Sequence, residues 1–230
     1  MQSFTSWLSQ LQFSFIWDYA VIVAASLLCI MFHEVSHGVT ALKLGDPTAK
    51  NAGRLTFNPI RHVDVWGLLM MAVFRFGWAK PVPVNARYFK HPVRDMAITA
   101  AAGPLSNVVL AFLALCLRAG TIYVNQKTGG VISGFFVTFF EYVAILSVGL
   151  AVFNVIPIPP LDGSKVVGAL LPERAYYGLL RYEKYGFLVI MVLLWSGLLD
   201  KPLVFCRTAL LDGLGAVSAF PYYILQAIFG

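Results

Sequence analysis

The hydrophobic pattern of the chain consists of long apolar runs separated by shorter polar stretches. A helix that crosses a lipid bilayer needs roughly 20 apolar residues. Five runs reach that length, at about residues 17–44, 96–118, 133–158, 176–199 and 203–229. The pattern therefore predicts an all-α polytopic membrane protein.

A shorter apolar stretch, Val65–Trp78, lies between the first two long runs and contains Arg75. It has too few residues to cross a bilayer comfortably, so we expect a re-entrant or interfacial segment, with a short tilted span as the alternative. Just beyond it, Pro81 and Pro83 favour an extended backbone, either as an edge strand or as a plain interfacial loop. We thus predict about five to six transmembrane helices, with a re-entrant or β-hairpin segment between the first and second long spans.

The composition agrees with a membrane protein. Hydrophobic residues make up 59% of the chain and charged residues 12%, against about 25% charged in a typical soluble domain. The three cysteines are far apart within apolar runs, which gives no disulfide framework and no cysteine-based metal site. With no repeat and no soluble insertion, we predict one domain over residues 1–230, with a core at about 20–170 and C-terminal helices at about 171–230.

The positive charges are distributed unevenly along the chain. Nine of the 17 Lys and Arg residues fall between Lys43 and Arg94, and four more lie at about 159–184. Such an excess marks the cytoplasmic side of a membrane protein and places the N-terminus outside. Because membrane orientation explains the net charge of +6, we expect no nucleic-acid partner.

One carboxylate lies inside a predicted span instead of at its end. Glu34 follows the apolar run Tyr19–Phe32 and belongs to the sequence His33-Glu34-Val35-Ser36-His37, an HExxH motif. Residues four apart lie one turn apart on the same face of a helix, so both histidines can bind one zinc ion. Glu34 would then stand beside the metal as a general base.

A catalytic zinc site needs a third protein ligand. Glu141 and Asp162 lie on either side of the third long span, and the HExxH histidines lie past the middle of an inward-running helix. Depth in the membrane therefore favours Asp162, which ends that span on the cytoplasmic side. His62 and Asp64 remain as alternative ligands.

The residues before Asp162 support this choice. Pro157, Pro159 and Pro160 cannot continue a regular helix, so the chain must unwind there. Unwound backbone at membrane depth is tolerated only where protein or a water-filled cavity surrounds it. The bend can direct the Asp162 carboxylate sideways towards a metal, although the same prolines would also suit a plain span end.

Three segments together resemble the site-2 protease family of intramembrane zinc metalloproteases: FHEVSHG (Phe32–Gly38), AGPLSN (Ala102–Asn107) and NVIPIPPLDG (Asn154–Gly163). LGDPTAKNAGRLTFNP (Leu44–Pro59) and GWAKPVPVN (Gly77–Asn85) are similar to the compact prokaryotic subgroup, which has no PDZ or CBS domain. The resemblance covers about residues 20–170.

The resemblance implies a set of roles. His33, His37 and Asp162 would bind one Zn²⁺ per chain and Glu34 would be the catalytic glutamate, while Asn107 and Asn154 would contact substrate. The substrate would be a transmembrane-helix protein or peptide within the lipid bilayer. The active site would lie towards the cytoplasmic side of a bacterial cytoplasmic membrane. The sequence predicts no oligomeric state.

Other functions remain as alternatives. A non-hydrolytic zinc-binding membrane transporter or sensor would need the metal ligands but not Glu34, and a helix-binding scaffold would need neither the metal nor the base. A di-iron desaturase would need more than the four histidines present. A rhomboid-type serine protease is excluded because Ser36 has no GxSG context.

Overall fold

The computed structural model describes residues 13–64, 67, 80–172, 176, 178 and 183–229, and within these ranges the chain is helical and contains no strand. The longest helices are α2 (Phe13–Lys43), α5 (Pro92–Thr128) and α6 (Val131–Asn154). The shorter helices are α3 (Thr48–Asn51), η1 (Pro59–Arg61), η2 (Ala86–Tyr88), α7 (Asp162–Gly168), α9 (Glu183–Trp195), α10 (Asp200–Ser218) and α11 (Phe220–Phe229).

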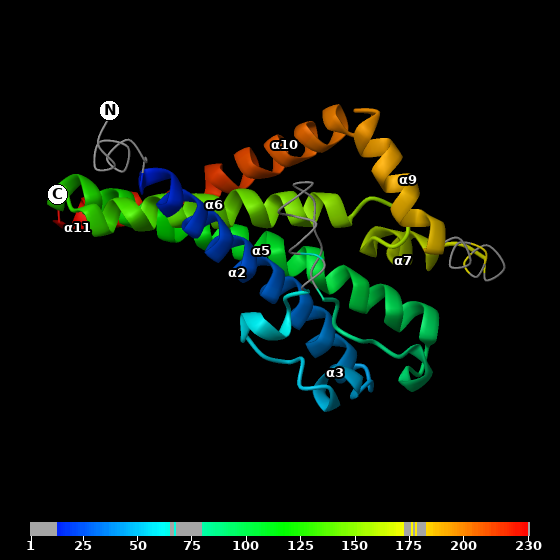
Figure 1. Ribbon diagram of the computed structural model, residues 1–230. Coiled ribbons are helices and arrows are strands. Elements are labelled where there is room, and N and C mark those ends of the chain that lie inside the picture. The colour runs from blue at the N-terminus through cyan, green and yellow to red at the C-terminus, as the bar shows by residue number, and fades with distance from the viewer. Residues whose placement is uncertain are drawn as a thin grey trace, which may run out of the picture.

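An antiparallel hairpin of α5 and α6 forms the centre of the molecule, and α2 crosses both helices (Figure 1). The hairpin turns at Gly129, whose φ of 60° places it in the left-handed region that glycine adopts without strain. Small side chains let the three helices approach closely, as is usual between helices in membranes. The buried cluster at the crossing consists of Ala25, Cys29, Leu110, Ala114, Val143 and Ala144.

Four helical segments are long and apolar enough to cross a membrane: Trp17–Lys43, Pro92–Thr128, Ser133–Asn154 and Asp200–Phe229. They match four of the five predicted runs, so the predicted all-α fold with several helices able to span a membrane is confirmed for the described residues. The remaining run, at about 176–199, falls partly on residues outside the described ranges, and its described helix α9 has 13 residues. The predicted re-entrant or β-hairpin stretch Val65–Trp78 lies outside the described residues, apart from Gly67.

The C-terminal helices return along the hairpin. Helix α9 turns away from the long axis of α5 and α6, and α10 then runs back beside them (Figure 1). Near the end of the chain, the Tyr222 hydroxyl donates a hydrogen bond of 2.9 Å to Gln126 near the end of α5. As a result, α2 begins and α11 ends at the same end of the molecule (Figure 1).

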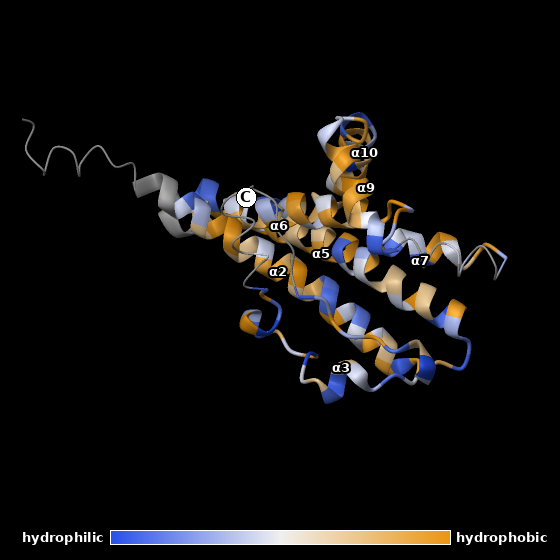
Figure 2. Ribbon diagram, turned by 45° about the vertical axis from the view of Figure 1, so that its right-hand side comes forward, coloured by the Kyte–Doolittle hydropathy of each residue, from blue (hydrophilic) through white to orange (hydrophobic). Residues whose placement is uncertain are grey.

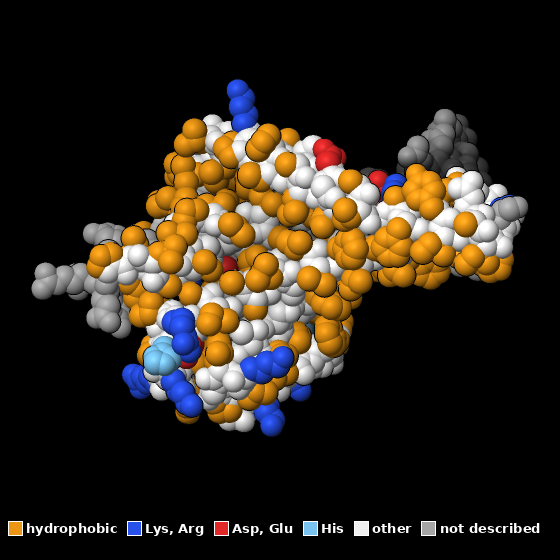
Figure 3. Space-filling view, turned by 180° about the vertical axis from the view of Figure 1, so that it is seen from behind, with side chains coloured by type: hydrophobic (Ala, Val, Ile, Leu, Met, Phe, Trp, Pro, Cys, Tyr) orange, Lys and Arg blue, Asp and Glu red, His pale blue; other side chains and the backbone are white. Residues whose placement is uncertain are grey.

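Polar and apolar surfaces are separated along the molecule. Figure 2 shows apolar residues along α2, α5 and α6, whereas α3 and the chain around it are more polar. Figure 3 shows Lys and Arg side chains gathered over one end of the molecule. Exposed cations at that end are Lys43, Lys50, Arg61, Lys80, Arg87, Lys90 and Arg94.

Candidate metal centre

The two HExxH histidines project from one face of α2. The ring centroids of His33 and His37 lie 4.6 Å apart, and their side chains are 7% and 11% exposed. This is the arrangement expected of residues one helical turn apart. The motif therefore presents two imidazoles to the interior of the bundle.

Asp162 reaches these histidines from a break in the helices. The chain leaves α6 at Asn154, passes through the proline-containing segment, and begins α7 at Asp162. The Asp162 Oδ2 atom lies 3.1 Å from the Nε2 atom of His33 and 3.2 Å from that of His37. Ligand atoms at the usual distances from a tetrahedral zinc ion are about 3.3–3.5 Å apart, so the distances from the carboxylate oxygen to the two histidines are close to those of a zinc site.

The hydrogen bond of His37 leaves its other ring nitrogen available to a metal. Its Nδ1 atom lies 2.7 Å from the backbone carbonyl oxygen of Thr99 on α5. A carbonyl only accepts hydrogen bonds, so Nδ1 carries a proton and Nε2 is the atom that faces the Asp162 oxygen. A proton or a metal ion can bridge Nε2 and the Asp162 oxygen. The second arrangement is typical of metal-binding histidines, which commonly donate their other ring N–H to a carbonyl.

The charge state of Asp162 suits a metal ligand. Burial alone would raise the pKa of its carboxyl group, but the contacts with His33 and His37 hold that pKa below its ordinary value. Asp162 is therefore present as a carboxylate. Its Oδ2 atom is buried and faces the two imidazole nitrogens at 3.1 and 3.2 Å.

Glu34 is held by a different segment. Its Oε2 atom accepts a hydrogen bond of 2.7 Å from the backbone N–H of Val82. Val82 lies between Pro81 and Pro83, in the polar loop that follows the first span. Glu34 thus follows directly after one candidate ligand in α2 and has one carboxylate oxygen fixed by the backbone.

The two predicted substrate-binding asparagines do not join the cluster. Asn107 is completely buried on α5, and its Nδ2 atom has no partner among the described residues. Asn154 donates a hydrogen bond of 2.9 Å to the Leu150 carbonyl of its own helix. Neither amide forms a hydrogen bond with His33, His37 or Asp162 in the described ranges.

The other proposed ligands lie elsewhere. His62 is buried, with its Nε2 atom 2.7 Å from the Thr56 carbonyl oxygen. Glu141 forms an ion pair of 3.4 Å with Arg118. Over the described residues, His33, His37 and Asp162 are the only set of three or more potential ligands, with their ligand atoms within 4.8 Å of one another.

A glycine of α5 makes room for the histidines. A Cβ atom added to Gly103 would lie 2.7 Å from the Cε1 atom of His33, and even closer to the ring of His37. Gly103 belongs to the AGPLSN segment noted in the sequence, which did not reveal this role. Neither did the sequence indicate Thr99, because any residue offers a backbone carbonyl.

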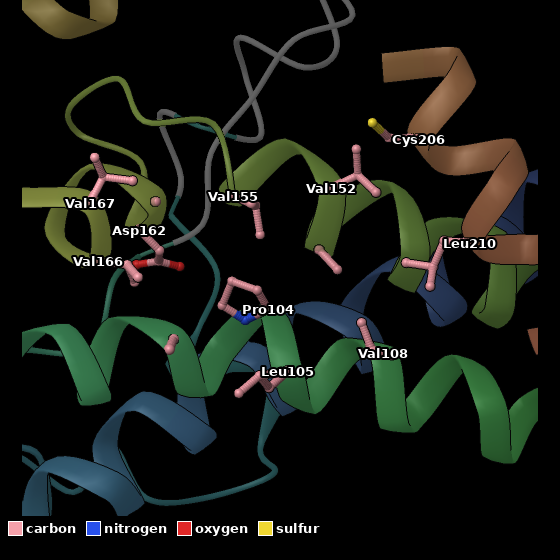
Figure 4. Close-up of a pocket in the computed structure, with 13 residues that line it drawn as sticks. Pro104, Leu105, Val108, Val152, Val155, Asp162, Val166, Val167, Cys206 and Leu210 are labelled. Carbon is pink, nitrogen blue, oxygen red and sulfur yellow. The ribbon is translucent and has the colours of Figure 1, made fainter. Parts of the chain in front are cut away.

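An apolar groove of about 390 Å³ opens beside Asp162. It lies between α5, α6, α7 and α10, with Asp162 at one end and Cys206 and Leu210 of α10 at the other (Figure 4). Asp162 is the only charged residue that lines it, within the described chain. The groove therefore leads an apolar ligand to the candidate metal centre.

Known proteins are similar to most of this chain. The family described as Peptidase family M50 matches residues 21–197. Putative zinc metalloprotease YwhC of Bacillus subtilis is 38% identical over 172 residues, which cover 75% of this chain and 78% of YwhC. Putative zinc metalloprotease Rip2 of Mycolicibacterium smegmatis is 29% identical over 196 residues, covering 82% and 71% of the two chains.

A third relative covers a similar part of the chain. Putative zinc metalloprotease MJ0611 of Methanocaldococcus jannaschii is 30% identical over 172 residues, which cover 70% of this chain and 80% of MJ0611. No solved structure matches the chain.

Proposed function

The chain belongs to peptidase family M50, and on that premise we propose which of its residues hydrolyse a peptide bond within the membrane. The family match confirms the predicted membership of the site-2 proteases. Together with the relatives named zinc metalloproteases, it makes the chain an intramembrane zinc metalloprotease. The transporter, sensor and scaffold alternatives gain no support from these comparisons.

His33, His37 and Asp162 are the residues that would hold the zinc ion. The observation that carries this assignment is the approach of both Nε2 atoms to one Asp162 oxygen, at 3.1 and 3.2 Å. Zn²⁺ with two neutral imidazoles and one carboxylate has a net charge of +1. The Glu34 carboxylate brings the site close to neutrality, which lowers the cost of burying it.

Glu34 is the proposed general base. When bound, zinc supplies Lewis-acid polarisation of the scissile carbonyl and lowers the pKa of a water molecule towards 7. The Glu34 carboxylate takes the proton of the attacking water and later delivers it to the leaving amine. Because Val82 binds only Oε2, the Oε1 atom of Glu34 remains for this proton transfer.

The substrate is a membrane-spanning protein or peptide that unwinds locally, because the carbonyls of an intact helix are hydrogen-bonded. The groove beside Asp162 favours apolar side chains next to the scissile bond, since burying a charged side chain there is costly. Asn107 and Asn154 are the proposed donors to the substrate backbone. Asn107 supports this role through its buried amide, which has no described partner.

We propose a single domain over residues 1–230, which has four spans among its described residues. An even number of spans agrees with the beginning of α2 and the end of α11 lying at one end of the molecule (Figure 1). The cations around α3, η2 and the start of α5 favour a cytoplasmic location for that region. The N-terminus then lies outside a bacterial cytoplasmic membrane and the metal centre towards the cytoplasm, with Val65–Trp78 as a re-entrant segment.

The direct test is the cleavage of model transmembrane segments by zinc-loaded protein in lipid vesicles, with products identified by mass spectrometry. We expect cleavage within or beside the apolar segment and loss of activity with a chelator. Full activity in the metal-free protein would contradict the proposal.

Replacing Gly103 with alanine is expected to displace the histidine ligands. The new methyl group would lie 2.7 Å from the His33 ring, well inside van der Waals contact. Zinc content, measured by mass spectrometry, should fall far below one ion per chain. Gly120→Ala on the same helix is the matched control, because its nearest neighbour would lie at an ordinary 3.8 Å. Equal zinc in both variants would contradict the close packing of Gly103 on the ligands.

Filling the groove is expected to change substrate preference. Val108→Trp places a large ring in the groove, so kcat/KM should fall by roughly 10–200-fold for substrates with Leu or Phe beside the scissile bond, and less for Ala. Val109→Trp, at a 58% exposed position of the same helix, is the control. An equal loss for all substrates, or none, would contradict the binding of substrate side chains in the groove.

A further inference from the structure

The segment that contacts Glu34 has only one backbone hydrogen-bond donor among three consecutive residues. In Pro81-Val82-Pro83, both prolines lack a backbone N–H, so Val82 has the only one. That single N–H is donated to the Oε2 atom of Glu34 at 2.7 Å. The position of this segment, Lys80–Asn85, therefore decides whether the proposed base has a backbone partner.

Buried polar groups fix both ends of Lys80–Asn85. At one end, the Arg54 guanidinium donates to the Lys80 carbonyl at 2.6 Å, and the Lys80 N–H donates to the His62 carbonyl at 2.9 Å. At the other end, the Asn85 N–H donates to the Asp46 Oδ2 atom at 2.7 Å. The segment is therefore anchored on either side of Val82.

Val82 itself is packed against the helix that carries the motif. Val82 is 8% exposed, and its Cγ1 atom would lie only 3.1 Å from a Cβ atom added to Gly38 of α2. Gly38 follows directly after His37 in the sequence. The absence of a side chain at Gly38 lets the extended segment lie close to the helix at the depth of Glu34.

The two anchoring side chains are costly to bury. Arg54 is 6% exposed and Asp46 is fully buried. Arg54 forms no ion pair in the described part of the chain, and its Nε atom has no partner there. Asp46 also accepts hydrogen bonds from the N–H and the hydroxyl of Thr48. Burying a charged side chain costs free energy unless hydrogen bonds compensate for the lost hydration. Arg54 and Asp46 both form hydrogen bonds with the backbone, one on each side of Val82.

We infer that Arg54 and Asp46 are positioning residues for catalysis: they hold Lys80–Asn85 so that the Val82 N–H orients the Glu34 carboxylate. The inference rests on the proposed role of Glu34 as the base. A hydrogen bond from an N–H to a carboxylate is among the stronger ones in proteins. It fixes one oxygen and leaves the other directed for proton transfer, which general-base catalysis requires.

The central experiment removes the N–H while keeping the extended backbone. Val82→Pro leaves three consecutive prolines and no donor to Glu34, whereas Val82→Ala keeps the donor and loses only the packing of the side chain. With zinc content unchanged in both, we expect kcat of Val82→Pro to lie roughly 10–100-fold below that of Val82→Ala. KM should be similar, because the substrate does not use this hydrogen bond.

Arg54 is tested against a neighbour of the same chemistry. Arg54→Met and Arg61→Met each remove one guanidinium that lines the same pocket beside Lys80. Arg54→Met should lower kcat roughly tenfold with zinc retained, and Arg61→Met should leave kcat unchanged. If Arg54 acts through Val82, then Arg54→Met should cost little further activity in the Val82→Pro background.

These variants separate failure of the inference from failure of the proposed function. Equal kcat in Val82→Pro and Val82→Ala would overturn the orienting role while leaving Glu34 as the base. Loss of zinc in Arg54→Met would show a merely structural role for Arg54. The same conclusion would follow if Arg54→Met lowered kcat by the same factor in the unaltered protein and in the Val82→Pro variant. If Glu34→Gln were itself active, the proposed base would be wrong.

Discussion

Glu34→Gln is expected to lower kcat by roughly 10²–10⁴-fold while the protein still binds one zinc ion per chain. Glutamine has nearly the shape of glutamate, and its amide oxygen can still accept the hydrogen bond from Val82. It cannot take a proton from water, so only proton transfer is lost. Single-turnover cleavage of a transmembrane peptide, with zinc measured on the same sample, checks this outcome.

The control for this prediction is Glu141→Gln. Glu141 is paired with Arg118 at 3.4 Å and its side chain is 47% exposed, so the same chemical change there should leave cleavage intact. Cleavage by Glu34→Gln within threefold of the unaltered protein would contradict the role of Glu34. The water would then have to lose its proton to another group.

Asp162→Ala is expected to weaken zinc binding by more than roughly 100-fold, since loss of an outer-shell partner alone costs about 10–100-fold. The substitution removes the carboxylate that lies within 3.2 Å of both histidines. Cleavage should disappear with the metal and should not return in micromolar zinc. Competition with a chromogenic chelator measures the affinity.

Glu141→Ala is the control for Asp162→Ala, because it also removes one carboxylate. This variant should keep its zinc. His37→Ala should behave like Asp162→Ala, because its Nε2 atom faces the same oxygen. Zinc retained at full affinity in Asp162→Ala would refute the three-ligand site. The metal would then have to use another ligand, such as His62 or Asp64.

The sequence predicted the parts of the site that follow from local geometry. A helix brings residues four apart onto one face, so the HExxH motif alone implied that His33 and His37 lie together. The depth of each carboxylate along its span then distinguished Asp162 from Glu141, and the structure brings Asp162 to the histidines. The long apolar runs likewise predicted four helices that the structure contains.

Other contacts carry no signature in the sequence. The Thr99 carbonyl and the Val82 N–H are backbone groups that nearly every residue possesses, and Gly103 acts through the side chain it lacks. Their importance depends on which helices and loops meet, and that depends on packing between distant segments. The span predicted from the apolar run at about 176–199 stays a prediction, because part of that run lies outside the described ranges; its described helix α9 turns away from the hairpin (Figure 1).

The paired prolines at positions 81 and 83 also limit how a peptide can lie along this loop. A regular β-ladder alternates donors and acceptors on each partner. With the Val82 N–H bound to Glu34, the stretch from Pro81 to Pro83 can offer a peptide only carbonyl oxygens. A peptide that lies there must supply the N–H groups itself, so this stretch discriminates against a substrate whose own prolines fall opposite it.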